Sequence, residues 1–266
     1  AEAVFTMPAR NVTLTATYAD AEASVTAGGS TTYHATMEEA IAYAEDQTGT
    51  VKVTVLQPAT IDEGVYITKG EMTIDLNGKA VWVEDKGFHV QSSAKVTFTD
   101  AAGSGSLKSD TASVITVGTE YETDAAEVIL EKGAYESGNH TIHVANAKAK
   151  ATIGADAVLK NSNATYGAAV LTAGTLIVTN DNLTGGSDDA DIRYKGGTIT
   201  LQGDPNGLTL LAYSGCTMPI SSITMPNGYA PYDADNNVVT GSTDHNKVVT
   251  IRGTSSVYSV TVVAGT

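Results

Sequence analysis

The sequence has little cysteine, few aromatic side chains and few positive charges. Its one cysteine, Cys216, excludes an intrachain disulfide and a metal site built on several thiolates. No His or Asp motif accompanies it, so we interpret it as a small, partly buried residue rather than a nucleophile. Acidic residues outnumber Lys and Arg 30 to 15, and a formal charge of -15 repels a phosphate backbone. We therefore expect no nucleic-acid partner.

Long apolar runs are missing as well. No stretch approaches the roughly 18 apolar residues of a membrane-spanning helix, so we expect no membrane insertion by this fragment. No basic segment followed by an apolar one opens the chain, and we expect any export signal to lie outside it. Charged residues make up only 17% and aromatic residues only 6% of the chain, whereas Gly, Ala, Thr and Val are plentiful. This composition favours an all-β fold of short strands and tight turns.

A short pattern recurs along the chain: an alternating strand, a corner of small residues and a second alternating strand. The last inward apolar residues of the second strands are Val55, Leu76, Phe98, Leu130, Ile153, Val178 and Leu201. Most of their separations are 21 to 25 residues, and one is 32. A third strand lies between these markers, at 80–83, 106–109, 134–137, 157–160 and 208–211. Three strands in such a period predict a parallel β-helix of about seven to eight coils.

Both ends of a solenoid need a cover, because a bare coil exposes apolar side chains and unpaired backbone groups. At the N-terminal end, residues 36–47 predict a capping helix, with Thr36 as N-cap and Glu39 completing a capping box. The helix would present one apolar face, formed by Met37, Ala40, Ile41 and Ala44. At the far end, residues 223–253 lose the period and predict an irregular, hairpin-rich β cap.

These elements carry a resemblance to a known family. Tyr33 is followed by EEAIAYA, VKVTVLQPATI and MTIDLNGKAV, and MPNGYAPYDADNNVVTG stands near the far end. This order resembles the pectate-lyase-like right-handed β-helix modules of very large surface proteins of Gram-positive, often gut-dwelling, bacteria. The resemblance implies a right-handed β-helix domain over residues 23–253 and an extracellular location, at the cell surface or in the cell wall.

The two chain ends resemble a different family. FTMPARNVTLTATY, residues 5–18, is similar to the last strands of internalin-type B repeats, and YSVTVVAGT, residues 258–266, is similar to the first strand of another. The resemblance implies that residues 1–22 end a preceding small β repeat or linker. It also implies that residues 254–266 begin a following one, so flanking domains of the same polypeptide are expected partners.

The segment SDDADIRYKGG offers the strongest candidate chemistry. Asp188, Asp189 and Asp191 could supply calcium ligands or an acid and a base, and Arg193 or Lys195 could bind a substrate carboxylate. Against this, the Gly-His-Gly element of glycosidases with this architecture is missing, and the chain has only three arginines, at positions 10, 193 and 252. We therefore expect a solvated acidic turn, and keep this set as the catalytic alternative.

Other polar groups have plainer interpretations. His140 and His143 are three residues apart in an alternating segment, which predicts side chains on opposite faces and no shared metal ion. Residues 233–237, DADNN, have the oxygen spacing of a calcium loop, but Val238 occupies the position where such a loop needs Gly. A β-turn is the favoured interpretation. We expect no cofactor or metal site, with calcium as the open alternative.

Two aromatic residues are candidates for ligand binding. Trp82 alternates with Val81 and Val83, so it lies outside if the valines point inward and in the core otherwise; the sequence leaves both open. Tyr121 lies in the insertion at 118–126, and loops that leave a rigid scaffold often carry binding functions.

Together these features favour a non-catalytic segment of a secreted or cell-wall-anchored bacterial surface protein. It would act as a rigid stalk or adhesin module that contacts glycans or host surface proteins. The alternative is a polysaccharide lyase or glycoside hydrolase on the same scaffold, since one fold supports both.

Overall fold

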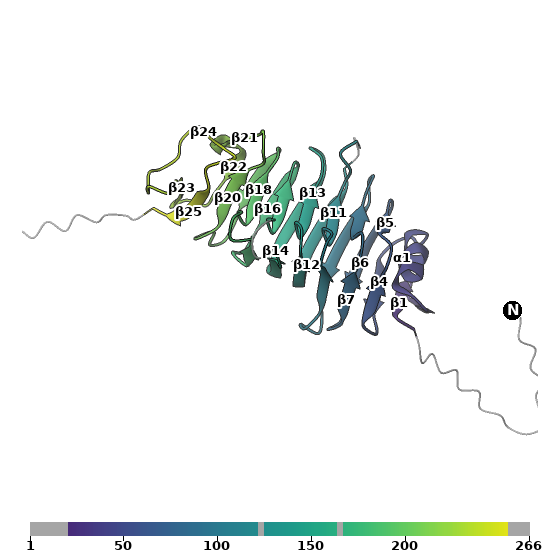
Figure 1. Cartoon of the computed structure of the whole chain (residues 1–266). Coiled ribbons are helices and arrows are strands. Elements are labelled where there is room, and N and C mark those ends of the chain that lie inside the picture. The colour runs from purple at the N-terminus through teal and green to yellow at the C-terminus, as the bar shows by residue number, and fades with distance from the viewer. Residues whose placement is uncertain (1–20, 122–124, 164–166, 255–266) are drawn as a thin grey trace, which may run out of the picture.

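In the computed structural model, which describes residues 21–121, 125–163 and 167–254, the chain forms a parallel β-solenoid of about seven turns (Figure 1). The all-β class and the repeating coil predicted from the sequence are confirmed. Most coils contribute one strand to each of three faces, and each strand pairs in parallel with the equivalent strand of the next coil. Among the described residues, no helix is long and apolar enough to cross a bilayer.

We number the three faces in the order in which each coil visits them. The first face contains β3 (Val51–Val55), β6 (Glu71–Asp75), β9 (Lys95–Thr99), the start of β12 (Glu127–Ser137), the start of β14 (Lys150–Asn161), β16 (Thr175–Val178), β19 (Thr198–Leu201) and β22 (Ile223–Thr224). The second contains β4 (Ala59–Ile61), β7 (Ala80–Val83), β10 (Ser106–Ser109), the ends of β12 and β14, and β17 (Leu183–Thr184). The third contains β5 (Val65–Ile67), β8 (Phe88–Val90), β11 (Ile115–Val117), β13 (Ile142–Val144), β15 (Val170–Thr172), β18 (Ile192–Tyr194) and β20 (Thr209–Ala212).

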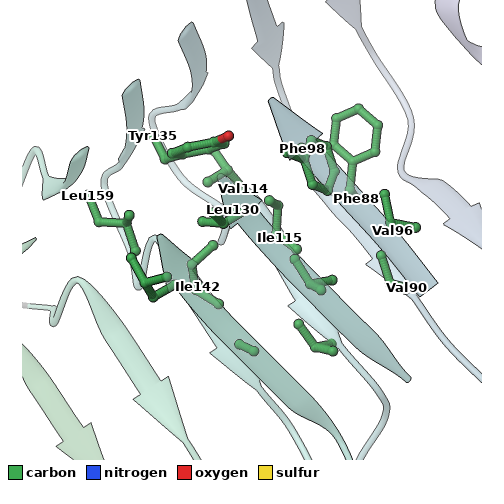
Figure 2. Packing of buried hydrophobic residues seen from close by; sticks show 14 of the residues in the cluster. Phe88, Val90, Val96, Phe98, Val114, Ile115, Leu130, Tyr135, Ile142 and Leu159 are labelled. Carbon is green, nitrogen blue, oxygen red and sulfur yellow. The ribbon is translucent and has the colours of Figure 1, made fainter. Parts of the chain in front are cut away.

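Inward apolar side chains form one continuous core along the solenoid. All seven marker residues are buried, from 0% to 2% exposed. One in-register row of the first face consists of Val53, Ile74, Phe98, Leu130, Ile153, Val178 and Leu201. The markers chosen for the first two coils, Val55 and Leu76, are therefore buried but stand two residues beyond this row. Figure 2 shows how side chains of successive coils meet, with Phe98 edge-on to Phe88 at 5.3 Å between ring centroids.

Buried polar side chains hold the corner between the first and second faces. Asp75 accepts hydrogen bonds from the Asn77 and Ala101 amides at 2.9 and 3.0 Å, and Lys52 Nζ lies 2.7 Å from its Oδ2. Burial opposes ionisation of Asp75, but Lys52 and these amides outweigh it and lower the pKa of the carboxyl group. Asp100, in the coil that follows Asp75, accepts from the amides of Gly78 in the preceding coil and of Gly105 in its own. These carboxylates accept hydrogen bonds from backbone amides where the chain turns, so that these amides are not left without a partner.

The predicted capping helix is confirmed as α1 (Met37–Glu45), which contacts β3, β4 and β5 and so covers all three faces of the first coil. Its buried residues are Met37, Ala40, Ile41 and Ala44, as predicted. Thr36 Oγ1 accepts from the Glu39 amide at 3.2 Å, whereas the Glu39 carboxylate reaches the Ala35 amide, one residue earlier than in a standard capping box.

A hairpin that the sequence reasoning missed lies beside α1. β1 (Ala23–Ala27) pairs antiparallel with β3 and with β2 (Ser30–His34), so the first face begins with two added strands. The two-residue turn is Gly28-Gly29, and both residues have positive φ, 57° and 82°. A Gly-Gly pair between alternating segments is a known hairpin signal.

The far end is irregular, as predicted, but begins earlier. The segment at 208–211 was expected on the ladder of Ala80–Val83; instead, β20 pairs with β18 on the third face, so that prediction is wrong. The turn Asp204–Gly207 replaces a second-face strand in this coil. The cap then adds β21 (Thr217–Pro219), the short helix η1 (Ile220–Ser222), β23 (Tyr229–Tyr232), β24 (Ser242–Asp244) and β25 (Val249–Gly253). β25 pairs antiparallel with β20. Residues 1–20 and 255–266, where the B-repeat resemblance falls, lie outside the described residues.

Candidate functional site

The outward side chains of the third face form one row along the solenoid. Parallel pairing aligns the middle residues of the three-residue strands with Leu211 of β20, in the order Tyr66, His89, Thr116, His143, Leu171, Arg193 and Leu211. The two leucines of this row are only 6% exposed. Neighbouring strands are about 4.8 Å apart, so the row is about 29 Å long. The row collects an aromatic ring, two imidazoles and a guanidinium, and we call it the third-face row.

The row begins with a stacked pair. The Tyr66 and His89 rings lie 4.8 Å apart at 17°, and Tyr66 is 46% exposed. Burial, with a smaller contribution from Lys86, lowers the pKa of His89, so the imidazole is neutral at pH 7. The pair therefore offers a flat, uncharged surface at the first coils.

His143 is the most perturbed group of the row. Burial lowers its pKa to about 4, with smaller contributions from His140 and Lys195, while Glu120 acts in the opposite direction. Its Nε2 atom is buried without a hydrogen-bond partner. A buried polar atom without a partner costs about 1–3 kcal/mol, and such groups are a reason to look for a ligand.

A long-range ion pair acts electrostatically on this part of the row. Lys195 Nζ lies 2.5 Å from Glu120 Oε1, although the residues are 75 positions apart. The Glu120 carboxylate raises the pKa of Lys195 and is itself held ionised, since Lys195 lowers its pKa. The Lys195 ammonium and the Arg193 guanidinium also lie 5.8 and 5.7 Å from the centroid of the Tyr213 ring.

Beside Arg193 lies a small polar pocket of about 290 Å³. It is lined by Gly138, Asn139, His140, Asn163, Gly167 and Arg193. His140 Nδ1 accepts a hydrogen bond from the Ala168 amide at 3.0 Å, so the ring proton of the neutral imidazole is on Nε2. A Cβ atom on Gly138 would lie 1.7 Å from the Asp110 carbonyl oxygen, so only glycine fits at this wall.

His140 and His143 do not lie on opposite faces of one strand, so that prediction is wrong. Only His143 lies in β13; His140 precedes the strand in a turn, where side chains do not alternate. The two imidazoles interact electrostatically. Within the described residues, no three His, Cys, Asp or Glu side chains gather as metal ligands would.

The three aspartates of the catalytic alternative do not converge. Asp189 is buried, accepts from the Gly167 and Ala190 amides at 3.0 and 2.8 Å, and lies 3.0 Å from Arg193 Nε without hydrogen-bond geometry. Asp191 accepts from the Gly185 amide and from both the amide and hydroxyl of Thr209, at 2.8 to 2.9 Å. The Asp188 carboxylate instead accepts from the neighbouring Ser187 hydroxyl at the surface. Arg193 and Lys195 do belong to the candidate site.

The remaining candidates lie apart from the third-face row. Trp82 points outward from β7 on the second face and is 37% exposed, because Val81 and Val83 point inward. This settles the choice that the sequence left open. Tyr121, next to Glu120, is 93% exposed. Residues 122–124 of the same insertion lie outside the described residues.

The segment 233–237 forms a turn closed on itself. Asp233 Oδ1 accepts from the Asp235 and Asn237 amides at 3.0 and 2.8 Å, and Asn236 has φ of 64°. The hydrogen bonds from Asn237 lower the pKa of Asp233. This arrangement agrees with the β-turn interpretation of the sequence.

The comparisons with known proteins add no family to these observations. No protein-family model, curated protein or solved structure matches the chain.

Proposed function

We propose that the chain is a non-catalytic, rigid segment of a secreted or cell-wall-anchored bacterial surface protein, whose third-face row contacts a glycan or a host surface protein. The observation that carries the proposal is how the carboxylates near that row are used. Asp189 and Asp191 each accept at least two hydrogen bonds from backbone amides of the solenoid. A carboxylate engaged in this way stabilises the fold and is poorly placed to exchange protons with a substrate.

The rigid role is supported by the continuous core and by the pairing between coils. Each coil contacts its neighbours through in-register strands, so the coils behave as one stiff rod. A row of partly exposed rings and hydrogen-bonding groups along such a rod suits the contact of an extended ligand. The extracellular location rests on the resemblance described above and is part of the proposal.

The alternative, a polysaccharide lyase or glycoside hydrolase, has one observation in its favour. Glu120, His143, Arg193 and Lys195 lie around one part of the row, and carboxylate, imidazole and cation are the groups of acid-base chemistry. However, Lys195 lowers the pKa of Glu120, which makes this carboxyl group a weak proton donor at neutral pH. The burial of His143 likewise makes it a weak base.

A panel of polysaccharides separates the two proposals. We expect binding by some members but no release of reducing ends or unsaturated products from polygalacturonate, alginate or neutral polymers, with or without calcium. Product that disappears in Asp189→Asn or Arg193→Ala, but persists in the control Asp188→Asn, would establish an enzyme and overturn the non-catalytic proposal. Asp188 is the matched control because it is an exposed aspartate of the same turn.

A further inference from the structure

Trp82 departs from the pattern of its neighbours on the second face. The outward row there consists of Thr60, Trp82, Lys108, Glu136, Lys160 and Thr184. Five of these six side chains are polar, as expected for a solvated face of a β-sheet. The indole is the one large apolar group, and 37% of it remains exposed. The inward valines on either side already fill the core at this strand.

A pocket of about 170 Å³ lies beside the indole. Its lining comes from four successive coils and consists of Trp82, Lys108, Ser109, Asp110, Glu136 and Ser162. One wall is therefore an aromatic ring, and the others carry hydroxyl, carboxylate and ammonium groups. A ligand with one apolar face and a polar edge would satisfy both kinds of wall.

The charges around this pocket balance. Lys108 Nζ lies 3.2 Å from Glu136 Oε2, and Lys160 Nζ lies 3.8 Å from Glu136 Oε1. With Asp110 the group holds two cations and two anions. An anionic or cationic ligand would gain little from such a group, whereas an uncharged ligand with several hydroxyls can use both its donors and its acceptors.

We propose that Trp82 and this pocket bind one ring of a neutral sugar, with the apolar C–H face of the pyranose on the indole and its hydroxyls toward Lys108 and Glu136. The proposal rests on the glycan contact proposed above and assigns it a second place on the rod, on a different face from the third-face row. Two sites on one rigid module would raise the avidity for a branched or multichain glycan.

The chain supplies its own probe, because Trp82 is its only tryptophan. We would titrate the protein with neutral hexasaccharides of glucose, mannose, galactose and xylose, and with oligogalacturonate as the anionic comparison. We expect a saturable change in tryptophan emission with at least one neutral sugar and none with oligogalacturonate. By calorimetry, Trp82→Ala should weaken that binding by about tenfold or more, and Trp82→Phe by less, because a ring remains.

Control variants separate this site from the third-face row. Thr184→Ala, on the same outward row but outside the pocket lining, should leave the fluorescence titration unchanged. Trp82→Ala should lower the urea midpoint by no more than about 0.3 M, since the side chain is partly exposed. No saturable change with any neutral sugar, or calorimetric binding that survives Trp82→Ala, would refute the site. If binding survives Trp82→Ala but is lost in Arg193→Ala, the glycan contact of the third-face row stands and the Trp82 site is refuted. If no glycan binds by calorimetry, the glycan contact fails as well; a preference for oligogalacturonate would refute the neutral class.

Discussion

The alternation of β12 makes a sharp prediction, because adjacent residues of similar size face opposite environments. Leu130 is 0% exposed and packs in the core row between Phe98 and Ile153, whereas Ile129 points outward between Thr97 and Thr152. Removing a buried leucine side chain costs about 2–5 kcal/mol, including the cavity left behind, so we expect about 3 kcal/mol for Leu130→Ala. For Ile129→Ala, on the partly solvated face, we expect about 1 kcal/mol or less.

Urea unfolding followed by circular dichroism measures the difference. With a denaturant dependence of about 3 kcal/mol per molar urea, Leu130→Ala should lower the midpoint by about 1 M and Ile129→Ala by about 0.3 M. Leu130→Asp should lower it further, because an unpaired carboxylate would be buried. Solenoids can unfold coil by coil, so hydrogen exchange in residues 96–98 and 151–153 should confirm that the loss centres on the adjacent coils. Equal shifts for the two alanine variants, or a larger one for Ile129, would refute the inward assignment of Leu130.

Two further predictions concern the cap and pH. Ile41→Lys should place a charge in the buried face of α1 and reduce hydrogen-exchange protection in residues 51–76. Tyr43→Lys, on the exposed side of the same helix, should leave this protection unchanged. Unchanged protection in both variants would show that α1 does not cover the core. The pKa of His143 is about 4 in the folded chain and about 6.5 in an unfolded one. The stability linked to the neutral imidazole is therefore complete above pH 6.5 and is lost as pH falls toward 4. The loss in the free energy of unfolding amounts to up to about 3 kcal/mol. Midpoints measured between pH 7.5 and 4 should fall less steeply in His143→Leu, and identical slopes would contradict the burial of a neutral imidazole.

The core could be predicted from the sequence because one rule, alternation at a fixed period, holds in nearly every coil. The two markers that stand off the in-register row show where the rule weakens. Asp75 and Leu76 are both buried after Ile74, since the chain turns a corner there and inward-facing positions no longer alternate. Choosing the last apolar residue of the strand then moves the marker two positions beyond its partner in the next coil.

The error at 208–211 has a related cause. LTLL has the composition of a strand, but residues 204–207 take the chain directly to the third face. Composition gives the existence of a strand, whereas its face depends on the number of residues in the preceding turn. The strand's pairing partner decides which face it joins, and the pattern of a single sequence does not reveal that partner.

The candidate site could also be predicted only in part, because only some of its residues repeat with the coil. The middle residues of VYI, FHV, ITV, IHV, VLT and IRY are outward by alternation, so most of the third-face row was present in the sequence once the third-face strands were aligned. The pairing of Glu120 with Lys195 was not, because it spans 75 residues and Glu120 lies in the insertion that interrupts the period. A periodic rule places residues that repeat with the coil. Contacts made by the segments that interrupt the period need the three-dimensional structure, and in this chain both partners of one such contact shift the pKa of the most perturbed histidine of the row.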